Sequence, residues 1–238
     1  MINESMLILA GGFGKRLRSV VSQVPKPLAP VLDKTFLYHL IQQWVSQGVR
    51  SFVFLLHHQS SLIEDFLSAE SDGILKGAEV FTVTEPRPLG TGGAVAYAVQ
   101  QLSLEGSFLV ANADTWLGTG VVQLVETSPP ALTVVKVKNS ERYGAVRFEN
   151  NCVTAFDEKD QSAGPGWINA GLCYLHADMF LGRGQQEFSL ERELFPQLVY
   201  ENKLHAVSLE TDFIDIGIPE DYRRFCRWIE SGKKLGIL

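Results

Sequence analysis

A cluster of glycines followed by a basic side chain stands close to the N-terminus. Gly11, Gly12 and Gly14 follow an apolar run at residues 7–10, and the basic pair Lys15 and Arg16 follows within the same turn. Glycine lets the backbone turn sharply and lets a ligand approach it closely. Free amide N–H groups beside a guanidinium make a site for phosphate. The spacing fits neither a P-loop nor a full dinucleotide fingerprint, so a plain strand-to-helix turn is the alternative.

Two lysines are further candidates for binding phosphate. Lys26 stands between Pro25 and Pro27, and prolines so close together exclude a helix and predict an extended, stiff segment. Arginine grips phosphate with two donors, whereas lysine acts as a point charge. For Lys159 a solvated surface position is the alternative interpretation.

Two aspartates follow apolar stretches and are candidate metal ligands. Asp114 comes at the end of the apolar run 107–111, and Asp215 lies between Ile214 and Ile216. Magnesium prefers one or two carboxylates together with water and phosphate oxygens. Both acids are therefore candidate ligands of Mg²⁺. The alternatives are a turn or helix cap for Asp114 and a cap of the last helix for Asp215.

A second loop rich in glycine and proline spans residues 85–93. Its glycines allow close contact with a flat base, and Glu85 could accept hydrogen bonds from a guanine edge, although an exposed Glu85 is equally compatible with the sequence. His57 and His58 are neighbours at a strand end, so they point to opposite faces and are not expected to share a metal. No serine stands in a Gly-x-Ser-x-Gly frame, which gives a hydrolase no support.

Alternating strands and helices must position these residues. Up to residue 130 the pattern predicts an α/β fold with a mostly parallel sheet, in which ligands bind at the carboxyl ends of the strands. From residue 131 onward the pattern predicts an insertion rich in strands. Strands are expected at 6–9, 51–56, 80–83, 107–111, 132–137, 145–148, 153–156, 167–174 and 204–208, and helices at 36–47, 60–67, 94–102, 117–127, 190–198 and 219–231.

Composition narrows the class of protein. The chain has 238 residues and a formal net charge of −6, which argues against a nucleic-acid partner. Its three cysteines are widely spaced and form no metal or disulfide pattern, so we expect thiols in a reducing compartment. No signal peptide and no membrane-spanning stretch is recognised, so we expect a cytoplasmic protein without a membrane partner. The sequence gives no indication of an oligomeric state.

Together these stretches resemble the sugar-1-phosphate nucleotidyltransferases, and the match runs in order from about residue 6 to residue 222. The seven segments that carry the resemblance are residues 9–17, 25–27, 89–93, 112–114, 157–159, 168–171 and 215–217. Each is modest alone, but the ordered set is specific.

The resemblance implies a Rossmann-like three-layer α/β fold with a mostly parallel mixed central sheet and a small β-rich sugar-binding insertion. It implies one domain over 1–238, with a nucleotide-binding half at about 1–130, a sugar-phosphate-binding half at about 131–222 and a C-terminal helix at 219–238. The partners are then a nucleoside triphosphate and a sugar 1-phosphate. The implied site residues are Arg16, Lys26 and Asp114 for catalysis, Gly11, Gly12, Gly14, Glu85, Gly90 and Thr91 for the nucleotide, Gly144, Glu158, Lys159 and Asn169 for the sugar phosphate, and Asp114 with Asp215 for Mg²⁺.

Within the family, the chain looks most like the D-glycero-α-D-manno-heptose 1-phosphate guanylyltransferases, which make GDP-heptose for bacterial surface polysaccharides. The segments behind this are the glycine pair, residues 89–93 and residues 213–222, and the chain ends without a hexapeptide-repeat domain. Mannose 1-phosphate guanylyltransferases and N-acetylmuramate 1-phosphate uridylyltransferases are the alternatives within the family. A regulator that binds nucleotide sugars without turnover is the alternative of another class.

Overall fold

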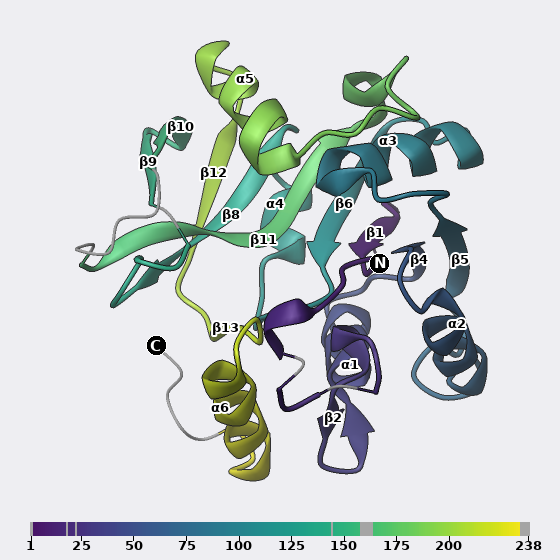
Figure 1. The fold of residues 1–238 in the computed structure, drawn as a ribbon. Coiled ribbons are helices and arrows are strands. Elements are labelled where there is room, and N and C mark those ends of the chain that lie inside the picture. Colours follow the sequence, from purple (N-terminus) through teal and green to yellow (C-terminus); the bar gives the residue numbers. More distant parts are fainter. Residues whose placement is uncertain (1, 18, 22, 144, 158–163, 234–238) are drawn as a thin grey trace. The chain divides into compact units, whose positions relative to one another are not determined.

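The computed structural model describes residues 2–17, 19–21, 23–143, 145–157 and 164–233. They form two compact units (Figure 1). The described residues of Met1–Pro88, Asn112–Gly118 and Asp212–Ile237 make the first unit, and those of Leu89–Ala111 and Thr119–Thr211 make the second.

The first unit contains three parallel strands with β4 in the middle of the order β5-β4-β1. The apolar runs in β1 and β4 are buried, which explains why these segments form strands with no alternation of polar residues. The three strands are β1 (Met6–Leu9), β4 (Ser51–Leu56) and β5 (Glu79–Thr84).

Helices and two small hairpins complete the first unit. Thr35 caps the first helix because its hydroxyl accepts a hydrogen bond from the amide of Tyr38 at 3.1 Å. Phe225 of the last helix packs edge-on against Phe36, with 4.7 Å between ring centroids. The elements are α1 (Phe36–Ser46), α2 (Ser60–Ala69), α6 (Pro219–Glu230), the pair β2 (Pro30–Val31) and β3 (Lys34–Thr35), and the pair β7 (Thr115–Leu117) and β13 (Phe213–Asp215).

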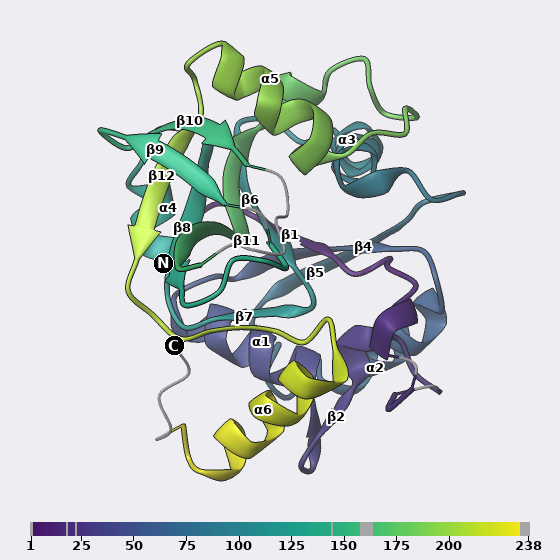
Figure 2. The same ribbon diagram turned by 60° about the vertical axis from the view of Figure 1, so that its left-hand side comes forward.

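The second unit is built on a mixed set of strands in the order β6-β11-β8-β12-β10-β9. Only β8 and β12 run parallel, and the other described pairs are antiparallel. Figure 2 shows the β9–β10 hairpin and the helix α5, whose Phe195 stacks on Phe156 of β10. The strands are β6 (Ser107–Asn112), β8 (Ala131–Val137), β9 (Val146–Glu149), β10 (Cys152–Phe156), β11 (Gly166–His176) and β12 (His205–Leu209), and the helices are α3 (Gly90–Leu102), α4 (Val121–Val125) and α5 (Phe195–Tyr200).

Most predicted elements are confirmed, and three predictions were wrong in detail. The helix expected at 117–127 is shorter, because residues 115–117 pair with β13 and leave only Val121–Val125 helical. The helix expected at 94–102 begins at Gly90. Lys26 is not in an extended segment, because Lys26–Leu28 forms a 3-10 turn that accommodates a proline in its first positions.

Within the part of the chain that the structure describes, no helix is both long and apolar enough to span a bilayer.

Candidate active site

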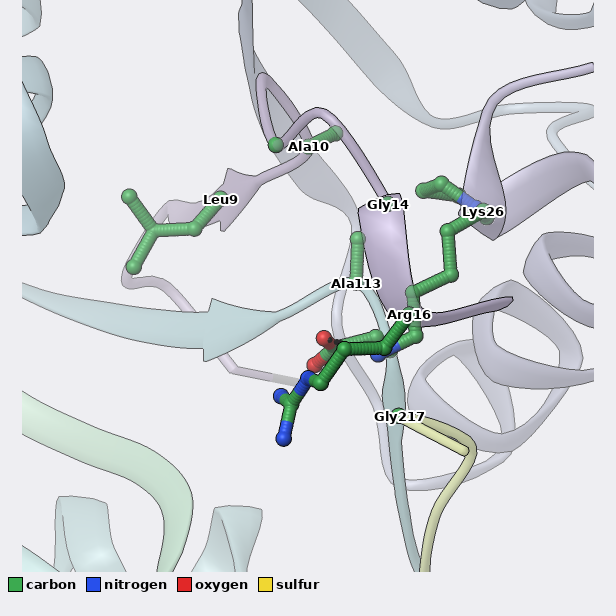
Figure 3. Close-up of a pocket in the computed structure, with 10 residues that line it drawn as sticks. Leu9, Ala10, Gly14, Arg16, Lys26, Ala113 and Gly217 are labelled. Carbon is green, nitrogen blue, oxygen red and sulfur yellow. Dashed lines mark hydrogen bonds and ion pairs between the residues drawn. The ribbon is translucent and has the colours of Figure 1, made fainter. Parts of the chain in front are cut away.

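A pocket of about 190 Å³ lies in the first unit, at the carboxyl end of β1. Figure 3 shows Arg16 and Lys26 coming from different loops and extending into this space, with Ala113 and Gly217 on neighbouring segments. The pocket is lined by Leu9, Ala10, Gly12, Gly14, Arg16, Lys26, Pro27, Ala113, Asp114 and Gly217. Position at a strand's carboxyl end agrees with the expectation from the sequence.

The ammonium group of Lys26 lies close to both predicted metal ligands. Its Nζ donates to Asp114 Oδ2 at 2.5 Å and lies 3.6 Å from Asp215 Oδ1. The side chains of Lys26, Asp114 and Asp215 are 10%, 37% and 20% exposed. The structure therefore brings together three residues that the sequence separates widely.

A short antiparallel ladder fixes the spacing of the two acids. Asp215 of β13 is the register partner of Thr115 of β7, and Asp114 precedes Thr115 directly. The amide of Ile216 donates to the carbonyl of Asp114 at 2.9 Å, and the hydroxyl of Thr115 donates to Asp114 Oδ1 at 3.2 Å. The ladder therefore fixes the two backbones relative to each other, and the Thr115 hydroxyl orients the Asp114 carboxylate within its own segment.

Gly217 is a site residue that the sequence reasoning did not assign. Its amide donates to Asp215 Oδ1 at 2.6 Å, and a Cβ built on it would lie 2.8 Å from the same oxygen. Only glycine lets the carboxylate fold back this closely. Residues 215–217 are one of the segments that resemble the family. The glycine two positions after Asp215 is the feature of the sequence from which its role could have been predicted.

The glycine turn is shaped around its neighbours. Gly14 has a φ of +59°, and a Cβ on it would lie 3.3 Å from the Cβ of Lys26. A Cβ on Gly11 would lie 3.1 Å from His57 Cβ and 3.4 Å from Glu85 Oε1, whereas none of the described atoms lies within 4 Å of one on Gly12. Gly11 and Glu85, both predicted to hold the nucleotide, are therefore neighbours, and Gly12 faces open space.

The two histidines pack against an aromatic ring instead of sharing a ligand. Phe13 is 43% exposed, and its ring centroid lies 5.8 Å from that of His57 and 5.1 Å from that of His58. His57 Nδ1 is also 3.3 Å from the carbonyl oxygen of Glu85. These contacts place Phe13 and His57 on the side of the glycine turn that faces Glu85.

Gly90 and Thr91, also predicted to hold the nucleotide, lie in the second unit against the segment around Phe188. A Cβ on Gly90 would lie 2.6 Å from the carbonyl oxygen of Phe188. The hydroxyl of Thr91 donates to Glu191 Oε2 at 2.7 Å and accepts from the amide of Leu190 at 2.9 Å. These two residues therefore have a structural role here, and their role in nucleotide binding stays a prediction.

The predicted sugar-phosphate residues are only partly described. Asn169 lies on β11, where its side-chain oxygen accepts from the amide of Gly171 at 3.0 Å and stabilises a local irregularity of the strand. Gly144, Glu158 and Lys159 lie outside the described residues.

An aromatic cluster lies behind the ladder that carries the acids. Trp116 packs on Trp228 with 5.3 Å between centroids, and the ammonium of Lys233 lies 4.6 Å above the Trp116 ring. Burial lowers the pKa of Lys233, against an opposing effect of Asp212. Burial likewise lowers the pKa of nearby His39. The cluster gives β7 a rigid, apolar support.

No group of three or more His, Cys, Asp or Glu side chains in the described ranges could hold a metal ion. A metal in this pocket would therefore depend on Asp114 and Asp215 together with oxygens from a substrate. This is the donor set that magnesium uses with phosphates.

Comparison with known proteins decides the family. Residues 5–231 match the family described as "Nucleotidyl transferase". The chain belongs to this nucleotidyl transferase family. The family predicted from the sequence is therefore confirmed.

Individual relatives of this nucleotidyl transferase are guanylyltransferases. It is 33% identical over 224 residues to the D-glycero-alpha-D-manno-heptose 1-phosphate guanylyltransferase of Aneurinibacillus thermoaerophilus, covering 92% of this chain and 95% of that one. It is 32% identical to the mannose-1-phosphate guanylyltransferase catalytic subunit beta of Drosophila pseudoobscura pseudoobscura, covering 94% of this chain and 62% of the relative. The prediction of a sugar-1-phosphate nucleotidyltransferase of the guanylyltransferase kind is confirmed at this level.

A solved structure shows the same fold. HddC from Yersinia pseudotuberculosis, complexed with GMP-PN, has a TM-score of 0.83 at 31% identity, covering 95% of this chain and 99% of that one. The expected α/β fold with a mixed sheet and flanking helices is thereby confirmed.

Proposed function

We propose that this nucleotidyl transferase moves a guanylyl group from GTP to D-glycero-α-D-manno-heptose 1-phosphate, giving GDP-heptose and pyrophosphate. The observation that supports it most is the pairing of Lys26 with both Asp114 and Asp215 in a pocket that Arg16 also lines. The relatives' names support the choice of base and sugar.

The proposed reaction needs positioning and charge neutralisation more than it needs a base. An oxygen of the sugar phosphate attacks the α-phosphorus of GTP in line, the bond from that phosphorus to the bridging oxygen breaks, and pyrophosphate leaves with the electron pair. A phosphate dianion is already a nucleophile, so no proton has to be removed from it. Two phosphate groups must nevertheless approach each other, which requires fixed positive charge.

The chain supplies that charge from two loops. Arg16 is exposed at the pocket, where its guanidinium can grip two phosphate oxygens at once. Lys26 is nearly buried, and its four-carbon stem allows its ammonium to move between the carboxylates and a bound phosphate. Gly12 and Gly14 leave the backbone of the turn open to the triphosphate.

We further propose Mg²⁺ as the cofactor. The donor set fits it, because two carboxylates already lie around one cationic group, the ammonium of Lys26. When bound, the ion would be held by Asp114 and Asp215 and would neutralise charge that develops on the phosphates. Asp114 and Asp215 would orient it through the ladder of β7 and β13, and Gly217 would hold the Asp215 carboxylate in place.

Specificity for guanine is assigned to the side of the glycine turn where Glu85 lies beside Gly11. A carboxylate there accepts the two N–H groups that guanine, unlike adenine or uracil, presents on one edge. Mannose 1-phosphate stays the second candidate sugar, on the name of the second relative. A cytoplasmic location follows in this proposal from the use of GTP.

The test is a screen for pyrophosphate release with the four common nucleoside triphosphates against several sugar 1-phosphates. We expect release with GTP and the heptose phosphate, and weaker release with mannose 1-phosphate. Asp114→Asn should lower turnover by at least about 100-fold, the size expected for removal of one charge-stabilising group. Turnover equal to wild type in this variant would refute the role given to Asp114.

The same screen separates an enzyme from a binding protein. If calorimetry shows that GTP binds while no sugar phosphate leads to pyrophosphate, the chain is a regulator without turnover. Release with UTP and N-acetylmuramate 1-phosphate alone would favour that alternative substrate pair.

A further inference from the structure

The ammonium of Lys26 lies within ion-pair distance of both carboxylates that would hold a metal. It is 2.5 Å from one carboxylate and 3.6 Å from the other. Lys26 begins the turn Lys26–Leu28, and a Cβ on Gly14 would lie 3.3 Å from its Cβ. A divalent ion bound to Asp114 and Asp215 would stand beside this ammonium and be repelled by it. In this geometry lysine and metal compete for the same two carboxylates.

We propose that Lys26 is a built-in counter-ion that keeps free divalent cations off Asp114 and Asp215. The cation then enters only together with the phosphates of the nucleotide, whose negative charge draws the ammonium off the carboxylates. This last step rests on the proposed function, whereas the exclusion of free cations does not.

Two features of the site support the exchange. The Asp114 and Asp215 carboxylates keep their positions through bonds that do not involve Lys26, namely those from the Thr115 hydroxyl and the Gly217 amide. The Lys26 side chain also lines the pocket into which Arg16 extends (Figure 3). A phosphate bound there can replace the carboxylates as the partner of the ammonium. Each carboxylate therefore keeps a hydrogen bond from its own segment when the ammonium leaves.

The test compares Mn²⁺ binding to the free protein, without nucleotide or sugar, by calorimetry. Lys26→Met should bind Mn²⁺ at least about tenfold more tightly than wild type, which is about 1.4 kcal/mol. The matched control is Lys34→Met, which removes a positive charge in the β2–β3 hairpin. The ammonium of Lys34 lies 4.5 Å from the centroid of the Tyr38 ring. Lys34→Met should bind like wild type.

Adding Asp114→Asn to Lys26→Met should remove the gain, because it removes one of the two ligands. Mn²⁺ affinity in Lys26→Met that does not exceed that of wild type would overturn the proposal. If Lys26→Met does not fold, the wild type still decides. We expect electron paramagnetic resonance to show Mn²⁺ bound by wild type only when GTP is added. Saturation of the wild type by equimolar Mn²⁺ alone, lost in Asp114→Asn, would refute the exclusion.

An inactive wild type that excludes Mn²⁺ would contradict the proposed function and leave this inference standing. An active wild type that binds free Mn²⁺ tightly would support the proposed function and contradict this inference. The two failures are therefore distinguishable.

Discussion

Replacement of Gly92 by alanine tests how the glycine loop that opens α3 is held. A Cβ on Gly92 would lie 2.2 Å from Cε2 of Phe188, 2.4 Å from its Cδ2 and 2.9 Å from its Cζ. Carbon atoms in good contact are about 3.5–4.0 Å apart, so the ring would have to move by more than about 1 Å. It has little room to move, because Phe188 is buried against Phe180 and Arg183.

We expect Gly92→Ala to lower the free energy of unfolding by about 1–3 kcal/mol, the usual cost of an overpacked core. For a chain of this length, each kcal/mol lowers Tm by about 2–4 °C. The backbone also contributes, because the amides of Gly92 and Gly93 both donate to the carbonyl oxygen of Phe188, at 3.0 and 3.2 Å. Displacement of Phe188 would therefore disturb the start of the helix as well as the core.

The assay is thermal and denaturant unfolding of four variants: Gly92→Ala, Phe188→Leu, the double variant and a control. Gly164→Ala is the matched control, since a Cβ there meets none of the described atoms within 4 Å. Phe188→Leu in the Gly92→Ala background should recover part of the loss, which a double-mutant cycle would record as a coupling energy. If Gly92→Ala unfolds at the same temperature as Gly164→Ala, the steric argument is wrong.

Two further predictions concern the base and the pH dependence of stability. Glu85→Gln should lower the preference for GTP over UTP, measured as the ratio of kcat/KM values, by about 10–100-fold, because hydrogen bonds to a charged group contribute about 1.5–3 kcal/mol; an unchanged ratio would exclude Glu85 from base recognition. Burial lowers the pKa of His39 in the folded protein below its ordinary value of 6.5, so the unfolded chain takes up more protons and stability should fall as pH drops through 6.5. His39→Leu should make Tm less sensitive to pH in that range, and an equally steep pH profile in the variant would contradict this assignment.

Local patterns were sufficient to predict most of the elements. A short apolar run predicts a buried strand, and the structure has β1 at Met6–Leu9. An apolar stripe at helical spacing predicts a helix, and the structure has α1 at Phe36–Ser46. Where the prediction failed, a distant segment decides the local structure. Leu117 was predicted to begin a helix, but its pairing with Phe213 of β13 makes it the end of a strand.

In the candidate site, too, the local sequence predicts some features and distant segments determine the others. The types of residue at Arg16, Lys26 and Asp114 pointed to phosphate and metal chemistry, yet their contacts depend on the tertiary fold. The direct pairing of Lys26 with Asp114 was not foreseen, because neither residue's neighbours in sequence carry information about it. The glycines near residue 92 were predicted for closeness to a ligand, whereas the structure shows that Phe188 occupies the space beside Gly92.

Burial of its neighbours explains how Asp215 comes to face Lys26. Ile214 and Ile216 are fully buried, and side chains on a strand alternate between its faces, so Asp215 must point the opposite way. Trp116, the register partner of Ile214, is also buried, and a slip of one residue would expose it. Apolar packing therefore sets the register of β7 and β13, and the register in turn sets the separation of the carboxylates. If the proposed Mg²⁺ site is correct, Trp116→Ala should weaken Mn²⁺ binding in the presence of GTP, measured by calorimetry, even though Trp116 is not one of the proposed ligands.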